Sequence, residues 1–579
     1  CAASTERRQV NATDTDQIVM TDKNTTPDTQ PSPPTQKMPP QKTPRAAAEL
    51  KLPWRGLGIW NVYFILKFAL AYFSYLNLDV LWNALLLVFL LIPIPYRWLS
   101  ALRGLAAIAA GAALAYSESW LPPIASLTTN AAAVKGFSLN YVIDFALDFI
   151  NWQMVGWAAL IFCLWYLLRN CVRITFITIC YFAVMVTMPY LDAFFAPAAR
   201  EAAAGGTETA EGGPAGAAAD SKTIEEWYQA FLNYEKERRA ELPQGLPDKD
   251  TPFDILLLNI CSLSNDDLIA SQLDKHPVLE KFNIRFDRFN SATSYSGPAA
   301  IRLLTGACGQ PSHQGIYGES RPECEILNRL GTIGYRQHMM FDHSGEYDSF
   351  LPTLRNETGL TADLESLGKN LAVRYMGFDD EELTDTLALL RYWQRTLQRA
   401  KDKRTVTFMN LIALHDGNRL PRHGRAEPFK PRAQKLLDDL QTFLRELERS
   451  GRKVMVVVVP EHGAAVRGDK IQAPRLRDIP SLRITEVPTM VKFVGLQGLP
   501  DAPIHVTGPT SYLAMTTLIG RTLETNFFSK KGGATPLESL VKDLPETNPV
   551  SENGQAKVLE YKGQEYLKQK DGDWKPYAK

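Results

Sequence analysis

The stretch Val454-Met-Val-Val-Val-Val-Pro-Glu461-His462-Gly463 places an unbroken apolar run directly before a carboxylate and an imidazole. Such a run is typical of a parallel strand that is buried on both faces. Further apolar runs occupy 254–260, 405–414 and 488–494, with helical patterns at 381–400 and 432–449 between them. This alternation predicts an α/β fold with a central, mostly parallel sheet.

Side chains able to bind metal follow three of these runs, at the ends where sites lie in such sheets. They are Cys261, His415 and the pair Glu461–His462. Thiolate, carboxylate and imidazole are zinc ligands, and three protein ligands leave a fourth position for a reacting group. Each also has an ordinary interpretation, as a small buried thiol, a hydrogen-bonded histidine or a solvated loop. Because all of them stand at the ends of apolar runs, a metal site is favoured. Adjacent Glu461 and His462 could reach one ion only on a tight loop, which Gly463 permits.

A second stretch, Asn290-Ser-Ala-Thr-Ser-Tyr-Ser296-Gly-Pro-Ala-Ala-Ile-Arg-Leu-Leu304, predicts a helix that begins near Ser296. Serine is a favoured N-cap and proline suits the first turn, so Ser296 is expected to lie at the N-terminus of this helix. Free backbone N–H groups and the helix dipole favour an anion there. An ordinary cap is one interpretation of Ser296, and a nucleophile that attacks phosphorus is the other. The candidate metal ligands elsewhere in the chain favour the nucleophile.

The N-terminal third of the 579-residue chain has a different composition. Residues 1–50 are polar and proline-rich, which predicts a disordered tail. From residue 57 to 195 the chain is nearly uncharged, and we predict five membrane spans at 59–77, 79–96, 104–120, 150–168 and 174–195. Six basic residues would then lie on one side of the membrane: Lys51, Arg55, Arg97, Arg103, Arg169 and Arg173. The loops on the other side contain Asp79, Glu118, Asp144 and Asp148, with Lys135 as their basic residue. This pattern predicts a cytoplasmic N-terminus and an external C-terminus.

Residues 196–222 are rich in Ala, Gly and Thr and are interpreted as a flexible linker. An amphipathic helix is expected at 224–239, within a catalytic domain that spans 223–579. Cys1 with Ala-Ala-Ser behind it would suit a lipidated terminus, but the predicted topology argues against lipidation. The 63 basic and 63 acidic residues balance, so overall charge does not indicate a nucleic-acid partner.

Together these residues carry a resemblance to a known family. A hydroxyl at a helix start, an acidic-His pair after an apolar strand and a ligand after the first strand resemble the alkaline phosphatase superfamily. Five spans with an external domain resemble the bacterial phosphoethanolamine transferases. The segments 259–264, 289–304, 414–418 and 453–463 are similar to the cellulose phosphoethanolamine transferases of enterobacterial cellulose secretion systems. The resemblance covers nearly all of residues 51–579.

The resemblance implies one zinc ion held by Cys261, Glu461 and His462, with Ser296 as a nucleophile whose oxygen approaches the metal. It implies His415 as a further catalytic residue. Phosphatidylethanolamine would be the donor, cellulose the acceptor, and subunits of the cellulose synthase complex the partners at the bacterial inner membrane. Tyr295, beside the nucleophile, would either line the acceptor site or serve packing.

Two cysteines of the predicted periplasmic domain, Cys308 and Cys324, are expected to pair in an oxidising compartment. The family has a bridge at this place, whereas two reduced buried thiols would suit a cytosolic domain. Other functions remain open: a lipopolysaccharide phosphoethanolamine transferase, a related hydrolase, or a non-catalytic scaffold of the cellulose synthase complex. Cys261 weakens the lipopolysaccharide alternative, because a carboxylate usually stands there in the wider superfamily.

Overall fold

The structure, a computed structural model, describes three parts of the chain. They are residues 56–118 without 73–75 and 77, residues 152–187, and residues 219–577 without 248, 319–320, 368–370, 400–401, 423, 530–535 and 571. The predicted tail with Cys1 and most of the predicted linker lie outside the described residues, as do Lys51, Arg55, Lys135, Asp144 and Asp148.

Apolar helices lie at all five predicted spans within the described residues: α1 (Trp60–Tyr72), α2 (Val80–Leu91), α3 (Arg97–Glu118), α7 (Trp152–Leu168) and Ile174–Thr187. Of these, Trp98–Glu118 alone is long and apolar enough to cross a membrane by itself. The third predicted span was placed too late, since Arg97 and Arg103 lie in α3 and not in a loop. Pro93 and Pro95 separate α2 from α3, and good helix formers follow directly.

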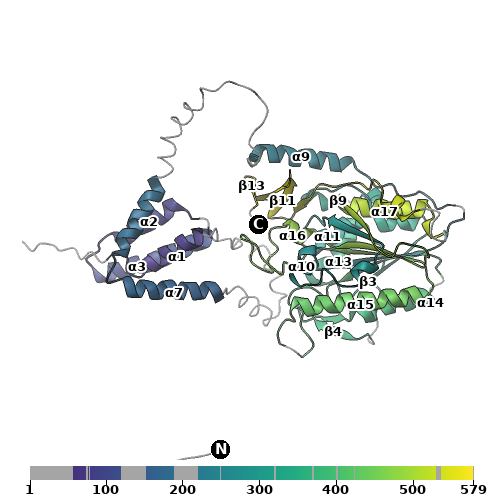
Figure 1. Cartoon of the computed structure of the whole chain (residues 1–579), viewed down its shortest axis with the longest axis horizontal. Helices are drawn as coiled ribbons and strands as arrows, with labels where there is room; N and C mark the ends of the chain where they lie inside the picture. Colours follow the sequence, from purple (N-terminus) through teal and green to yellow (C-terminus); the bar gives the residue numbers. More distant parts are fainter. Residues whose placement is uncertain are drawn as a thin grey trace, which may run out of the picture. The chain divides into compact units, whose positions relative to one another are not determined.

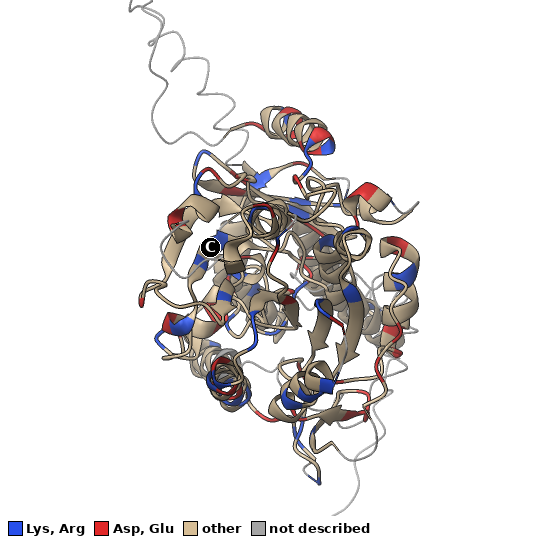
Figure 2. Cartoon of the chain, turned by 90° about the vertical axis from the view of Figure 1, so that its right-hand side faces the viewer, with Lys and Arg blue, Asp and Glu red and all other residues tan. Residues whose placement is uncertain are grey.

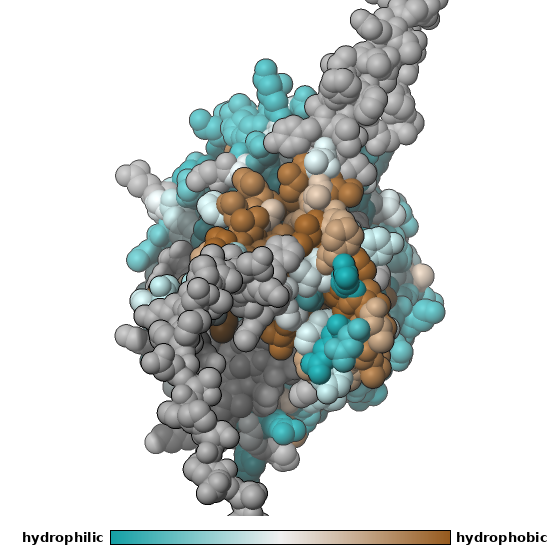
Figure 3. All heavy atoms as spheres, turned by 90° about the vertical axis from the view of Figure 1, so that its left-hand side faces the viewer, coloured by the Kyte–Doolittle hydropathy of each residue, from teal (hydrophilic) through white to brown (hydrophobic). Residues whose placement is uncertain are grey.

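The surface of these helices is apolar. Several large apolar side chains of these helices are each more than half exposed, namely Trp82, Trp98, Leu105, Trp157 and Leu167. Figure 3 shows hydrophobic residues gathered on the face that it presents to the viewer. Exposed apolar patches of this extent are rare on water-soluble monomers. The surface is suited to contact with lipid.

A buried ion pair joins the first three helices. Lys67 Nζ of α1 lies 2.5 Å from Glu118 Oε2 of α3 and 2.7 Å from Asn83 Oδ1 of α2. Asn83 in turn donates a hydrogen bond to Glu118. Because charges in an apolar environment are costly unless they are paired, this contact fixes how the three helices meet.

The C-terminal part is built on a seven-stranded sheet with strand order β3-β6-β1-β7-β8-β2-β9. The strands are β1 (Asp254–Ile260), β2 (Ile284–Phe289), β3 (Arg336–Phe341), β6 (Thr405–Leu411), β7 (Val454–Pro460), β8 (Thr489–Val494) and β9 (Ile504–Thr510). Strands β3, β6, β1 and β7 are mutually parallel, while β8 runs antiparallel to β7 and β2. The predicted mostly parallel sheet is therefore confirmed.

Helices cover both faces of the sheet (Figure 1). One face carries α11 (Ser296–Leu304), α12 (Ile326–Thr332), α13 (Phe350–Thr358) and α17 (Tyr512–Glu524), and the other carries α10 (Asn265–Ala270), α14 (Thr386–Arg399) and α15 (Phe429–Arg449). In β1, Ile255 and Leu257 belong to the first core, whereas Leu256 and Leu258 belong to the second. This two-sided burial explains the continuous apolar runs.

Several predicted boundaries were wrong. Residues 382–384 form β5 (Glu382–Thr384), which pairs with β4 (Val373–Met376), so the helix predicted at 381–400 begins only at Thr386. The strand predicted to reach residue 414 ends at Leu411. The amphipathic helix α9 (Ser221–Glu237) begins inside the predicted linker, because the Asp220 side chain caps it by accepting from Thr223 N at 2.7 Å.

A small antiparallel sheet ends the chain and was not predicted. It consists of β10 (Val550–Glu552), β11 (Ala556–Tyr561), β12 (Gln564–Gln569) and β13 (Lys575–Pro576). Helix α9 packs on it through Ile224, Tyr228 and Phe231 (Figure 1). Two short helices, α16 (Leu482–Thr485) and α18 (Leu537–Val541), and several single 3-10 turns also belong to the described structure. Figure 2 shows basic and acidic residues interspersed over the side that faces the viewer.

Candidate active site

The central strands place three candidate ligands together. Strand β1 lies between β6 and β7, and the register pairs Ile260 with both Leu411 and Pro460. Cys261 and Glu461 therefore follow adjacent strands at the same edge. The backbone extends this pairing, since Cys261 N donates to Leu411 O at 2.8 Å and Glu461 N donates to Ile260 O at 2.9 Å.

The ligand atoms of Cys261, Glu461 and His462 all lie within 4.8 Å of one another. His462 Nε2 is 3.9 Å from both Cys261 Sγ and Glu461 Oε2. All three residues are at most 1 % exposed. The structure thus brings these three predicted ligands into one buried cluster.

Ser296 joins this cluster from the start of α11. Its Oγ lies 3.4 Å from Cys261 Sγ and 3.3 Å from His462 Nε2. Ser296 lies at the helix N-terminus, as predicted, but it is the first helical residue and not the cap: Tyr295 occupies the cap position, without a side-chain cap bond. The Ser296 hydroxyl is therefore directed to the cluster and not to the backbone of its own helix.

The cluster fits a bound zinc ion. His462 Nδ1 donates to Gly463 O at 2.9 Å, so Nε2 presents its lone pair to Cys261 and Ser296. This contact is shorter than the 3.4 Å between His462 Nδ1 and Arg477 Nη1, so we assign the Nδ1 proton to it. Glu461 Oε2 is buried with no hydrogen-bond partner. An orphaned carboxylate oxygen beside a thiol and an imidazole lone pair matches the donor set of zinc.

Burial opposes charge on these ligands when no cation is near. It raises the pKa of Cys261 to about 12, with the adjacent Glu461 contributing, and it also raises the pKa of the Glu461 carboxyl. Burial lowers the pKa of His462. A divalent cation would stabilise the thiolate and carboxylate that burial disfavours.

Arg477 contributes the nearest guanidinium to the cluster. Its Nη1 donates to Ser262 Oγ at 3.1 Å, beside Cys261. The residue lies in the irregular segment between β7 and α16, where no periodic pattern marks it, so the sequence did not single it out. Its charge suits the binding of an anionic group next to Ser296.

His415 follows β6 and its ring stacks near Phe378, with ring centroids 4.2 Å apart. Its Nδ1 donates to Asp416 O at 2.8 Å, which leaves the lone pair on Nε2. Burial and the nearby Arg477 lower the pKa of His415 to about 3, so the ring is neutral at physiological pH. Among the described residues, no hydrogen bond joins His415 to the four clustered side chains.

Tyr295 lies at the rim, 37 % exposed, and its hydroxyl donates to Asp478 Oδ1 at 3.0 Å. Both interpretations of this residue stay predictions. The predicted bridge between Cys308 and Cys324 is present, with an S–S distance of 1.99 Å. It ties the segment after α11 to the short turn that precedes α12.

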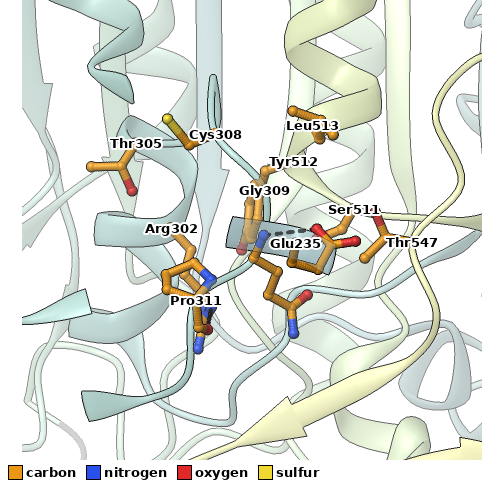
Figure 4. Close-up of a pocket in the computed structure, with 12 residues that line it drawn as sticks. Glu235, Arg302, Thr305, Cys308, Gly309, Pro311, Ser511, Tyr512, Leu513 and Thr547 are labelled. Atoms are coloured by element: carbon orange, nitrogen blue, oxygen red, sulfur yellow. Dashed lines mark hydrogen bonds between the residues drawn. The ribbon is translucent and has the colours of Figure 1, made fainter. Parts of the chain in front are cut away.

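A separate pocket lies beside this bridge (Figure 4). It is lined by residues such as Glu235, Arg302, Cys308 and Tyr512. Arg302 Nη1 donates to Pro311 O at 2.8 Å, and Glu235 Oε2 accepts from Gln310 N at 2.9 Å. None of the four clustered side chains lines this pocket, so it is distinct from the candidate active site.

The fold and the cluster define an α/β protein with a candidate metal centre beside a serine hydroxyl. A family model described as "Cellulose biosynthesis protein BcsG C-terminal domain" matches residues 208–574, and one described as "Cellulose biosynthesis protein BcsG N-terminal domain" matches residues 60–188. The chain belongs to the cellulose biosynthesis protein BcsG family.

Two relatives are similar over most of their length. The cellulose biosynthesis protein BcsG of Salmonella typhimurium is 40 % identical over 558 residues, which cover 93 % of this chain and 99 % of the relative. That of Escherichia coli K12 is 39 % identical over 543 residues, covering 90 % and 97 %. A solved structure, the integral membrane lipooligosaccharide phosphoethanolamine transferase A from Neisseria meningitidis, is similar with a TM-score of 0.39 and 10 % identity, covering 83 % of this chain and 97 % of that one.

Proposed function

We propose that this chain is a membrane-anchored, zinc-dependent transferase that moves phosphoethanolamine from phosphatidylethanolamine to cellulose. The observation that carries the proposal is the buried cluster of Cys261, Glu461 and His462 with the Ser296 hydroxyl against it. Membership of a family named for cellulose biosynthesis supports cellulose as the acceptor. The resemblance of the same motifs to phosphoethanolamine transferases supports the group that is transferred.

In the first half-reaction, Ser296 Oγ attacks the phosphorus of the donor. A bond forms between Oγ and phosphorus, the bond to the glycerol oxygen breaks, and diacylglycerol leaves with a proton on that oxygen. Cys261, Glu461 and His462 would hold the zinc ion. Bound zinc lowers the free-energy cost of the serine alkoxide and stabilises negative charge on the phosphoryl oxygens.

The protein orients the phosphoryl group from two sides. Hydrogen bonding within α11 begins with Ala299 N, which donates to Tyr295 O, so the N–H groups of Ser296 and Gly297 have no partner inside the helix. These N–H groups and the Arg477 guanidinium favour an anion in front of Ser296. The geometry suits stabilisation of the negative charge on the phosphoryl oxygens.

In the second half-reaction a glucosyl hydroxyl of cellulose attacks the phosphoethanolamine on Ser296. The bond between phosphorus and Ser296 Oγ breaks, and the serine regains a proton. His415, neutral and with its lone pair on Nε2, is the group we assign to these proton transfers. Tyr295 at the rim would contact the acceptor.

The N-terminal helices would keep this reaction at the membrane that contains the donor. We place residues 51–195 in the bacterial inner membrane as five spans, joined by a linker to a periplasmic catalytic domain at 223–579. The N-terminus would be cytoplasmic. Subunits of the cellulose synthase complex are the partners we propose, because the acceptor emerges from such a complex.

Solid-state NMR of extracellular cellulose tests the acceptor. Cells that lack this protein would be complemented with the wild type, with Ser296→Ala, or with the exposed-serine control Ser539→Ala. Phosphoethanolamine signals should appear with the wild type and with the control variant only. Signals that persist without the protein would refute cellulose modification by this chain.

A further inference from the structure

A chain of hydrogen bonds between buried polar side chains ends on Glu461. Asn259 of β1 and Asn410 of β6 are direct cross-strand partners in the parallel register. Asn410 Nδ2 donates to Asn259 Oδ1 at 2.8 Å and to Glu461 Oε1 at 2.5 Å. His343, just after β3, lies on the other side, with Nε2 2.9 Å from Asn410 Oδ1. The two asparagines are at most 1 % exposed.

Backbone groups at both ends fix the direction of every bond in this network. Gly345 N–H donates to His343 Nδ1 at 3.0 Å, so the ring proton must be on Nε2. His343 Nε2 therefore donates to Asn410 Oδ1. At the far end, Asn259 Nδ2 donates to Val459 O at 3.0 Å, which leaves Asn259 Oδ1 to accept. Both constraints turn the amide nitrogen of Asn410 toward Glu461.

The network distinguishes the two oxygens of the Glu461 carboxylate. Both N–H donors of Asn410 are used, one by Asn259 and one by Glu461 Oε1. Glu461 Oε2 has no hydrogen-bond partner and is the oxygen within 3.9 Å of His462 Nε2. Without the Asn410 donor, Oε1 would also be a buried acceptor without a partner, and nothing in the network would select which oxygen meets the other ligands.

The charge on His343 supports the same arrangement. Burial lowers the pKa of His343 to about 4, so the ring is neutral over the physiological range. A neutral imidazole with one proton is what the fixed network needs, because a second proton on Nδ1 would oppose the Gly345 N–H group. The Phe341 ring stacks on His343 at 5.0 Å between centroids and further holds its plane.

We propose that Asn410 and His343 are positioning residues that hold Glu461 with Oε2 directed to the metal. The inference rests on the metal centre of the proposed function but not on its donor, acceptor or covalent step. Partners of this kind, behind the ligands, typically contribute 10- to 100-fold in metal affinity. His343 acts only through Asn410, so its effect should be the smaller one.

The test measures zinc affinity of the detergent-solubilised full chain by competition with a chromophoric chelator. Asn410→Leu removes the donor at similar volume, and His343→Phe removes the second donor while keeping an aromatic ring beside Phe341. Asn410→Leu should weaken zinc binding about 10- to 100-fold, and His343→Phe less. His343→Gln, whose amide nitrogen can replace Nε2, should recover most of the loss.

A control and a second readout separate positioning from instability. Asn283→Leu removes another buried asparagine, directly before β2, which accepts from Phe493 N at 2.9 Å and lies outside the metal cluster, so it should keep wild-type zinc affinity even if it lowers the melting temperature. The absorption bands of the Co²⁺-substituted protein should shift in Asn410→Leu and stay unchanged in Asn283→Leu.

Two different failures can be told apart. A wild-type chain that binds no zinc would overturn the metal site of the proposed function and this inference with it. A wild type that binds zinc, together with Asn410→Leu and His343→Phe of unchanged affinity and unchanged cobalt bands, would overturn only the positioning role. Should Asn410→Leu fail to fold, His343→Phe and His343→Gln decide the matter: equal affinity in the two would refute the inference.

Discussion

At the residue scale, the proposed chemistry rests on three buried candidate ligands and one hydroxyl. Cys261, Glu461 and His462 are almost completely buried, and burial disfavours the thiolate and the carboxylate. An arrangement of this kind is costly unless a cation compensates it. The joint burial of a thiol, an imidazole and a carboxyl with one oxygen lacking a hydrogen-bond partner is therefore a physical argument for a metal, independent of any resemblance.

Loss of one ligand should abolish tight zinc binding. Cys261→Ala and His462→Ala leave two ligands each, so purified protein should contain far less than one zinc per chain by elemental analysis. His276→Ala is the matched control, because His276 is also buried but pairs with Asp438. Wild-type zinc content in either ligand variant would contradict the assignment.

The sequence could place the residues that end apolar runs and the serine at a predicted helix start, and could not place those that no such pattern marks. Cys261 and Glu461–His462 stand directly after β1 and β7, and parallel register brings such positions together. Arg477 lies in an irregular segment, and His343 and Asn410 become visible only when strand register joins β3, β6 and β1. The catalytic role of His415 stays a prediction.

At the scale of elements, the disulfide connects α11 to the segment before α12. Cys308 and Cys324 are 16 positions apart, and closing a loop of about 15 residues contributes about 3 kcal/mol in the entropic view of disulfides. Replacing both cysteines by Ala should lower the free energy of unfolding of the C-terminal α/β part by about this amount. Denaturant unfolding of the variant and of the wild type, each with and without reductant, measures the difference.

Thiol alkylation provides the control for this prediction. After zinc removal and denaturation without reductant, peptide mass spectrometry should find Cys261 alkylated and both Cys308 and Cys324 protected. Ready labelling of Cys308 under these conditions would refute the bridge.

The free energy of unfolding should fall when one partner of the Lys67–Glu118 ion pair is removed. Lys67→Met leaves Glu118 as a buried, uncompensated carboxylate, and removing one member of a buried pair costs about 3–5 kcal/mol. The double variant Lys67→Met with Glu118→Leu removes both charges and should be more stable than the single one. Thermal unfolding in detergent ranks the three proteins, and a double variant less stable than Lys67→Met would contradict the prediction.

Elements with a clear apolar pattern could be predicted, and elements with mixed patterns could not. Strands β1, β6, β7 and β8 are apolar runs and were found, whereas β2, β3 and β9 carry charged or polar residues at several positions. β9 is the last strand in the order of the sheet, so its outer side has no strand neighbour in that sheet. Tertiary pairing, rather than local hydrophobicity, makes these segments strands.

At the scale of the whole molecule, the membrane topology stays a prediction. In the part of the chain that the structure describes, five helices lie where spans are expected, and one of these is long and apolar enough to cross by itself. Alkaline phosphatase fused after residue 78 or 579 should be active, because those positions would be periplasmic. Fusions after residue 95 or 170 should be inactive. Activity after residue 95 would contradict the five-span arrangement.

The small C-terminal sheet could not be predicted from the sequence, because it depends on contacts between distant parts of the chain. Its strands are short, and β11 and β12 mix apolar with charged and polar residues without strict alternation. The sheet is stabilised by α9, whose Tyr228 hydroxyl donates to Glu552 Oε1 at 2.8 Å across 324 residues of sequence. Contacts this distant along the chain leave no local pattern.

The covalent step on Ser296 is the central claim, and peptide mass spectrometry after incubation with phosphatidylethanolamine and no acceptor tests it most directly. Wild-type protein should carry phosphoethanolamine on the Ser296 peptide. The Ser296 side chain forms no helix-capping hydrogen bond, so none is lost in Ser296→Ala. This variant should therefore fold, keep most of its zinc and carry no adduct.

Two further variants complete this measurement. Glu461→Ala should form no adduct, whereas His415→Ala should form it slowly or fail to discharge it when cellulose oligosaccharide is added. The account predicts that mass addition and transfer both depend on Ser296. Undiminished phosphoethanolamine transfer by Ser296→Ala would contradict it.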